Sequence, residues 1–193
     1  MSEISELTSI AKILKSKKIY ILCALKFETL NSKEIIYSGV GKINATFAAT
    51  NLINTLKPIQ IINYGTAGSV NDKIFGLKEC TNFIQHDIDV SPLGFTKGET
   101  PYDKINMISS KNNNGITCAS GDSFIVNNRN ILADIVDMEA YAIAKVCKIM
   151  RVKFDCYKFI TDNANEDNPD DWMLNSKKGL SLLIDELKLK YNL

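Results

Sequence analysis

Three carboxylate side chains in this sequence each follow a strongly apolar run. Glu28 comes shortly after IYILCAL at 19–25, Glu139 follows IV at 135–136, and Asp162 follows FDCYKFI at 154–160. Such runs predict buried strands, and in parallel sheets ligands bind beyond the carboxyl ends of the strands. Carboxylates that meet there can exchange protons with a ligand, because burial and neighbouring charges tune each one separately. Any one alone would be an ordinary solvated acid, so the repeated placement carries the prediction of acid/base chemistry.

Glycines accompany two further apolar runs. The run IIYSGV at 35–40 meets Gly39 and Gly41, and the run IQIINYGTAG at 59–68 ends in a segment with two glycines. Because no polar hairpin pair is present, we expect the second run to open at its end into a loop that approaches a ligand.

The elements that must position these residues follow from apolar periodicity. Helical spacing recurs over 7–14, 45–56, 140–150 and 180–187, with Pro58 ending the second helix. Further strands are expected within 81–90, 115–122, 135–139 and 154–162, and a polar loop at 109–115. Alternating strands and helices imply an α/β sheet covered on both faces. Without a repeat or a linker, residues 1–193 are expected to form a single domain.

Composition excludes several classes of partner. The 193 residues carry 23 basic and 22 acidic side chains, with no block of like charges, so neither nucleic acid nor an anionic membrane is an expected partner. No apolar stretch approaches the roughly 18 residues that a membrane span needs, and a cytoplasmic location is expected. The five cysteines lack the spacing of metal or dithiol motifs, so we interpret them as buried thiols.

Seven segments, in unbroken order over residues 19–190, resemble the methylthioadenosine/S-adenosylhomocysteine nucleosidases within the purine nucleoside phosphorylase superfamily. The segments are ALKFE at 24–28, SGVGKINA at 38–45, INYGTAGSV at 62–70, HDIDVSPLGF at 86–95, SGDSFI at 120–125, VDMEAYAIA at 136–144 and FITDNA at 159–164. The resemblance implies a trimmed three-layer α/β/α sandwich with a mixed central sheet. It also implies hydrolysis of the N-glycosidic bond of a 5′-modified adenine nucleoside, without metal or cofactor.

Carried over to this chain, the resemblance makes Glu28 the general base for the attacking water and Asp162 the acid that protonates the departing base. An anionic purine leaves poorly, so its protonation should contribute roughly 10²–10⁴-fold to the rate. The competing interpretation of Asp162 is a helix N-cap beside Asn163.

The resemblance further implies that Glu139 binds both ribose hydroxyls above an apolar floor made by Met138. Phe124 would stack on the purine, and the backbone of Ile125 would read its edge. The competing interpretations are a first-turn helix acid for Glu139 and a core side chain for Phe124. The water end of the pocket would be lined by Gly39, Val40, Gly41, Thr66, Ala67 and Gly68.

Water is the expected nucleophile because a phosphate clamp is missing. Related phosphorylases hold phosphate with arginines, whereas the two arginines of this chain, Arg129 and Arg151, lie outside the matching segments. A phosphate-using phosphorylase and a non-catalytic nucleoside-binding protein remain the alternatives. Methylthioadenosine, S-adenosylhomocysteine, deoxyadenosine and futalosine-like substrates are not distinguished.

The chain also departs from the family. Only nine residues separate Glu28 from Ser38, so the sheet should be trimmed, and Lys158 stands where the family often has arginine. Trp172 could cap the pocket or dock the last helix. The resemblance implies that Leu93 and Phe95 reach into the site of a second subunit, so a homodimer is expected.

Overall fold

A computed structural model describes residues 2–70, 74–110, 115–123, 131–163 and 178–193, with only the backbone of 161–163. The first half of the chain forms α1 (Glu3–Ser16), β1 (Ile19–Cys23), the 3₁₀ turn η1 (Lys26–Thr29), β2 (Ile36–Tyr37), α2 (Lys42–Leu56), β3 (Gln60–Ser69) and β4 (Gly76–Gln85). The second half forms the 3₁₀ turn η2 (Ser91–Leu93), β5 (Met107–Ser109), β6 (Ile116–Ser120), β7 (Ile135–Asp137), α3 (Ala140–Met150), β8 (Lys153–Asn163) and α5 (Gly179–Tyr191).

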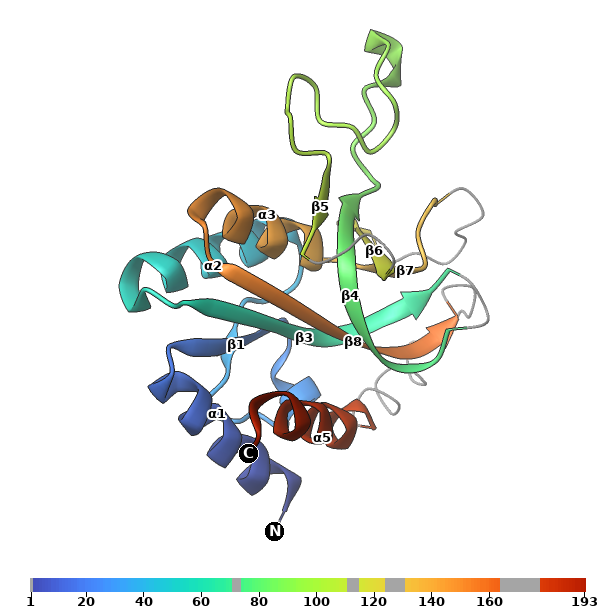
Figure 1. The fold of residues 1–193 in the computed structure, drawn as a ribbon. Helices are drawn as coiled ribbons and strands as arrows, with labels where there is room; N and C mark the ends of the chain where they lie inside the picture. The colour runs from blue at the N-terminus through green and yellow to red at the C-terminus, as the bar shows by residue number, and fades with distance from the viewer. Residues whose placement is uncertain (1, 71–73, 111–114, 124–130, 164–177) are drawn as a thin grey trace.

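Three layers stack as predicted, with helices on both faces of a mixed sheet (Figure 1). Helices α1 and α5 cover one face, where Leu7, Leu14 and Leu183 are fully buried against β1, β3 and β8. Helices α2 and α3 cover the other face through Ala45, Ala49 and Ile143 among others. Ala45 and Ala49 of α2 share one buried cluster with Ala142 of α3, and small side chains at such a contact let the two helices pack closely.

The described strands follow the order β2-β1-β3-β7-β6-β4-β5, and β8 pairs with both β3 and β4. Five of the strands therefore form a closed ring, through the pairings β3–β7, β7–β6, β6–β4, β4–β8 and β8–β3. This closed ring was not anticipated from the sequence. It depends on three long strands, because β8 lies between β3 and β4 and pairs with both, while the end of β3 also pairs with β7 (Figure 1).

Three predicted strands differ from those observed. The strand expected within 81–90 lies earlier in the chain, since β4 spans Gly76–Gln85. The run at 59–68 was expected to open into a loop, and this was wrong, because β3 continues to Ser69 and pairs with β8 as far as Asn163. The glycines there accompany a register shift between Ala67 and Gly68. The run at 35–40 keeps only two strand residues, since the chain turns at Gly39, with φ +81°, toward α2. The short strand β5 carried no recognised signal.

The predictions for the helices and for the cysteines hold for the described residues. The four periodic segments are helices, and Pro58 follows α2, which ends at Leu56. All five cysteines are buried and free. Within the described ranges, no helix is both long and apolar enough to cross a bilayer.

Candidate functional site

The carboxylate of Glu28 lies in a nest of hydrogen-bond donors at the end of β1. Its side chain is buried, and the backbone N–H and hydroxyl of Thr66 donate to Oε1 at 2.8 and 2.9 Å. The backbone N–H of Leu25 donates to Oε2 at 3.0 Å, and the thiol of Cys23 donates to the same oxygen at 3.2 Å. Four donors fix the orientation of this carboxylate before any ligand binds.

Gly65 lies beside both this carboxylate and the ammonium group of Lys158. A Cβ atom at Gly65 would lie 3.3 Å from Nζ of Lys158 and 3.5 Å from Oε1 of Glu28. The contact with Nζ would be tight, so the absence of a side chain at Gly65 leaves room for the ammonium beside this part of the strand. The glycine therefore serves a close approach within a strand, in place of the expected loop.

Lys158 is a fully buried cation paired with a buried acid. Its Nζ lies 2.7 Å from Oδ2 of Asp137, and both side chains are 1% exposed. Burial works against the charge of Lys158, but Asp137 and other neighbours raise its pKa well above the ordinary value. Burial likewise opposes ionisation of Asp137, yet Lys158 holds the pKa of Asp137 below its ordinary value. Both groups are therefore charged at neutral pH.

Asp137 also organises the start of α3. Its Oδ2 accepts the backbone N–H of Ala140 at 2.9 Å, and its Oδ1 accepts the hydroxyl of Ser120. The same hydroxyl oxygen accepts the N–H of Tyr141 at 2.8 Å. The capping function belongs to Asp137, which the sequence interpretation missed. An acid inside IVD and a lysine inside FDCYKFI were the available signal, since buried charges require partners.

Glu139 occupies the N-cap position of α3 but makes no capping hydrogen bond. Its Oε1 instead accepts the backbone N–H of Gly41 at 2.9 Å, which joins α3 to the start of α2. Burial and the negative charge of Asp137 raise the pKa of Glu139 to about 7, and Lys158 opposes them. The dipole interpretation of this residue is therefore incomplete, because its carboxyl group is directed at another element.

The amides at the start of α2 are occupied by the protein's own carboxylates. Besides the bond from Gly41 to Glu139, the N–H of Lys42 donates to Oδ1 of Asp122 at 2.7 Å. Gly41 has φ +94° and its missing Cβ would lie 3.1 Å from that same oxygen. The side chain of Lys42 pairs with Asp87, whose other oxygen accepts the N–H of Asp122 at 2.8 Å. Three segments distant in sequence are thus tied together at one edge of the sheet.

Several predicted residues cannot be placed beside this cluster. Phe124, Ile125, Trp172 and Arg129 lie outside the described residues. The backbone of Asp162 pairs with Gly68 on β3. The side chain of Asp162 is not among the described parts of the structure. Among the predicted lining residues, Ala67 is buried and Met138, Gly41, Thr66 and Gly68 are partly exposed, while Val40 is 40% exposed. No group of His, Cys, Asp or Glu within the described ranges is arranged to hold a metal ion.

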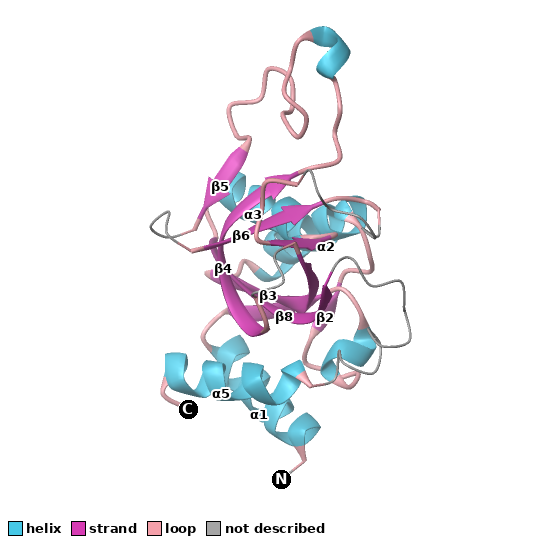
Figure 2. Ribbon diagram, turned by 90° about the vertical axis from the view of Figure 1, so that its right-hand side faces the viewer, coloured by secondary structure: helices cyan, strands magenta, loops and turns pink. Residues whose placement is uncertain are grey.

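Leu93 and Phe95 lie on an arm, residues 86–106, which projects from the ends of β4 and β5 (Figures 1 and 2). Leu93 is 74% exposed. Phe95 packs edge-on against Tyr102, with ring centroids 5.5 Å apart. Both figures show the arm leading away from the sheet.

The only histidine lies at the base of the arm. His86 donates its backbone N–H to Ser120, and Gly121 leaves space for the imidazole, because a Cβ there would lie 2.3 Å from Nε2. Burial lowers the pKa of His86. A packing role fits this contact, in line with the structural role that a lone histidine more often has.

Comparison with known proteins identifies the class to which this fold and site belong. A sequence model of the family described as "Phosphorylase superfamily" matches residues 29–185. The 5′-methylthioadenosine/S-adenosylhomocysteine nucleosidase of Staphylococcus haemolyticus is 32% identical over 163 residues, which cover 70% of this chain and 72% of the relative. The nucleosidase of the same name from Buchnera aphidicola is 31% identical over 190 residues, covering 81% and 79%.

Solved structures agree on the fold. The Helicobacter pylori 5′-methylthioadenosine/S-adenosylhomocysteine nucleosidase superposes with a TM-score of 0.78 at 22% identity, covering 90% of this chain and 97% of that one. The futalosine hydrolase of the same organism gives a TM-score of 0.78 at 22% identity, with the same coverage. The chain belongs to the phosphorylase superfamily and, within it, to the family of the 5′-methylthioadenosine/S-adenosylhomocysteine nucleosidases.

Proposed function

We propose that this chain hydrolyses the N-glycosidic bond of a 5′-modified adenine nucleoside, methylthioadenosine or S-adenosylhomocysteine, and releases adenine. Relatives with that name match more than two thirds of this chain and of their own length. The buried carboxylates at the sheet edge supply the acid/base groups that such a reaction needs.

In the proposed mechanism Glu28 orients a water molecule and takes its proton. Four donors hold the carboxylate in one orientation. Asp162 protonates a ring nitrogen of adenine as the bond to the sugar breaks. Positive charge grows on the ribose at that stage, and a neighbouring carboxylate stabilises it.

Glu139 is proposed to bind the two ribose hydroxyls. With a pKa near 7, its carboxyl group is partly protonated in the free protein. Two hydroxyl donors favour the ionised form of the carboxyl group. Sugar binding should therefore promote ionisation of Glu139, and ionised Glu139 should bind the sugar more tightly. Met138, which is half-buried beside it, would contribute the apolar surface below the sugar.

One observation carries the choice of water over phosphate. The amides that an anion would use are already bonded to protein carboxylates, because Thr66 donates to Glu28, Gly41 to Glu139 and Lys42 to Asp122. A phosphate would have to displace these groups and would meet their negative charge. Arg151 is exposed just past the end of α3, opposite the end where Glu139 lies.

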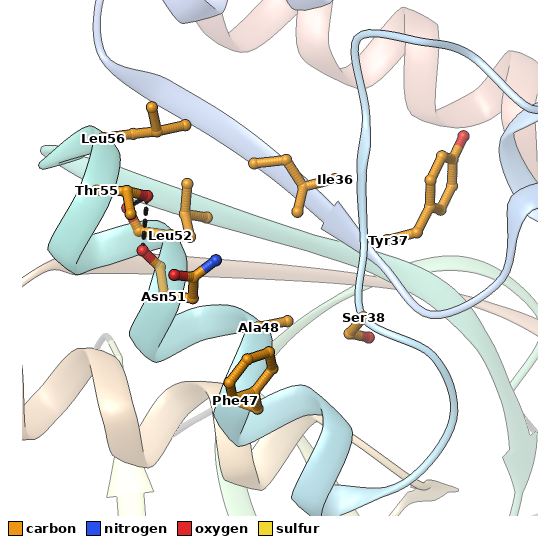
Figure 3. Close-up of a pocket in the computed structure, with 9 residues that line it drawn as sticks. All are labelled: Ile36, Tyr37, Ser38, Phe47, Ala48, Asn51, Leu52, Thr55 and Leu56. Carbon is orange, nitrogen blue, oxygen red and sulfur yellow. Dashed lines mark hydrogen bonds between the residues drawn. The ribbon is translucent and has the colours of Figure 1, made fainter.

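We further propose that the working unit is a homodimer in the cytoplasm. Each chain carries a projecting arm on which Leu93 is exposed, and a pocket between α2 and β2, shown in Figure 3, where Phe47 is 73% exposed. A two-fold dimer buries such paired features twice by symmetry. Five free buried thiols fit a reducing compartment.

The test is adenine release from methylthioadenosine, S-adenosylhomocysteine, deoxyadenosine and futalosine by the purified protein. We expect turnover of at least one of the first two, and Asp162→Asn should abolish it while leaving substrate binding within about tenfold, because the acid acts mainly in the transition state. Binding of nucleosides without any turnover would contradict the proposal and favour a binding protein. Nearly full activity of Asp162→Asn would return that residue to a capping role.

A further inference from the structure

The thiol of Cys23 is in direct contact with the carboxylate proposed as the general base. Cys23 ends β1 and is fully buried. Its Sγ lies 3.2 Å from Oε2 of Glu28 and 3.6 Å from the carbonyl oxygen of Leu25. The thiol has one proton to donate, and the carboxylate is the nearer and stronger acceptor.

Burial first, and then the charge of Glu28, raise the pKa of Cys23 well above the ordinary value, while Lys158 acts weakly in the opposite direction. The sulfur therefore keeps its proton at neutral pH. A thiol in this state supports the neighbouring carboxylate as a donor and does not compete with it as an anion.

The two oxygens of Glu28 differ in their donors. Oε1 accepts the N–H and the hydroxyl of Thr66, whereas Oε2 accepts the N–H of Leu25 and the thiol. A thiol is a weaker donor than a hydroxyl, so Oε2 is the less strongly held oxygen. When Oε2 takes up a proton, the S–H group can turn toward the carbonyl of Leu25, and the sulfur then faces the new O–H as a weak acceptor.

We propose that Cys23 is a positioning residue for Glu28, which makes Oε2 the oxygen that receives the proton of the attacking water. In that step a water O–H bond breaks and its proton passes to Oε2. The water oxygen forms its bond to the anomeric carbon of the sugar, and the electron pair of the glycosidic bond leaves with the base, which Asp162 protonates. The inference rests on the proposed role of Glu28 in hydrolysis.

The S–H stretching band in the infrared tests the contact without substrate. Subtracting the spectrum of Cys23→Ser from that of the unmodified protein isolates the band of this thiol. The band should move to higher frequency in Glu28→Gln, because a neutral amide is a weaker acceptor than a carboxylate. A band that stays in place in Glu28→Gln overturns the inference, whatever the protein does to nucleosides.

Kinetics then test the positioning role, with Cys147→Ala as the control. Cys147 is a buried thiol of α3 that has no carboxylate partner among the described residues. Losing a donor favours the protonated carboxyl group of Glu28. In Cys23→Ala, the low-pH side (the acid limb) of the plot of kcat/KM against pH should therefore move about half a pH unit to higher pH. The value of kcat should fall about threefold to tenfold. Cys23→Ser, with a stronger donor, should move the limb to lower pH.

A purely structural role for Cys23 predicts a different pattern. Cys23→Ala, Cys23→Ser and Cys147→Ala would then lower the thermal midpoint and leave the acid limb unchanged, and that result overturns the inference. A third result is possible, in which neither the unmodified protein nor any variant releases adenine but the infrared band still moves in Glu28→Gln. The hydrogen bond between Cys23 and Glu28 is then confirmed. In that case the proposed function fails, and with it the positioning role in catalysis.

Discussion

Replacing Lys158 by methionine removes one partner of a buried ion pair and keeps a side chain of similar length. Among the described residues, the carboxylate of Asp137, whose side chain is 1% exposed, then retains only the hydroxyl of Ser120 and the N–H of Ala140 as donors. Removing one member of a buried pair typically costs about 3–5 kcal/mol, because an uncompensated charge stays behind. We expect Lys158→Met to lower the free energy of unfolding by about 4 kcal/mol, a large part of the stability of an ordinary domain.

Urea unfolding followed by circular dichroism at neutral pH measures this loss. The matched control is Lys145→Met, which breaks a 2.5 Å pair with Asp103 whose side chains are 22% and 27% exposed. That loss should be much smaller than the loss in Lys158→Met, since solvent screens the pair. Adding Asp137→Asn to Lys158→Met should recover part of the stability, because the unpaired charge is then gone. A loss in Lys158→Met no larger than in Lys145→Met would refute this account of the pair.

Three further predictions follow from the carboxylates and the arm. Burial and Asp137 raise the pKa of Glu139 to about 7, so the folded protein binds a proton that the unfolded chain releases near pH 4.5. Relative to Glu139→Gln, stability should therefore fall by about 3 kcal/mol as the pH rises from about 4.5 to about 7, which paired urea titrations measure. Asp122→Ala frees the N–H of Lys42 at the start of α2, so the free energy of unfolding should fall by about 1 kcal/mol. Phosphate could then bind the free N–H and should begin to inhibit adenine release. Leu93→Asp should weaken self-association and substrate affinity together in sedimentation and kinetic assays, whereas a fully active wild-type monomer would remove the arm from the site.

The sequence predicted the main elements because their apolar patterns are strong and local. The placement of Glu28 and Glu139 at the edge of the sheet could also be predicted, since each ends a run that must be buried. Which hydrogen bonds they form could not, because the donors come from Thr66 and Gly41 on other elements. Spacing along the sequence does not tell how close such segments lie in the folded chain.

The partners of the buried charged side chains were the part of the site that could least be predicted from the sequence. A lysine within an apolar strand indicates a partner somewhere, but the identity of Asp137 depends on the closed ring that brings β8 near β7 and β6. The same limit explains Gly65, whose missing side chain serves an approach by Lys158 that no local pattern encodes. Cys23 was interpreted as a buried thiol, which is correct as to burial, and its contact with Glu28 depends on the turn η1.

The product formed in the presence of excess phosphate tests the central claim most directly. With methylthioadenosine as substrate, the account predicts free methylthioribose and adenine, formed at the same rate with and without phosphate, and loss of both products in Glu28→Gln. Mass spectrometry distinguishes the free sugar from its phosphate ester. Formation of the sugar 1-phosphate, or a rate that depends on phosphate, would contradict the account and identify the chain as a phosphorylase.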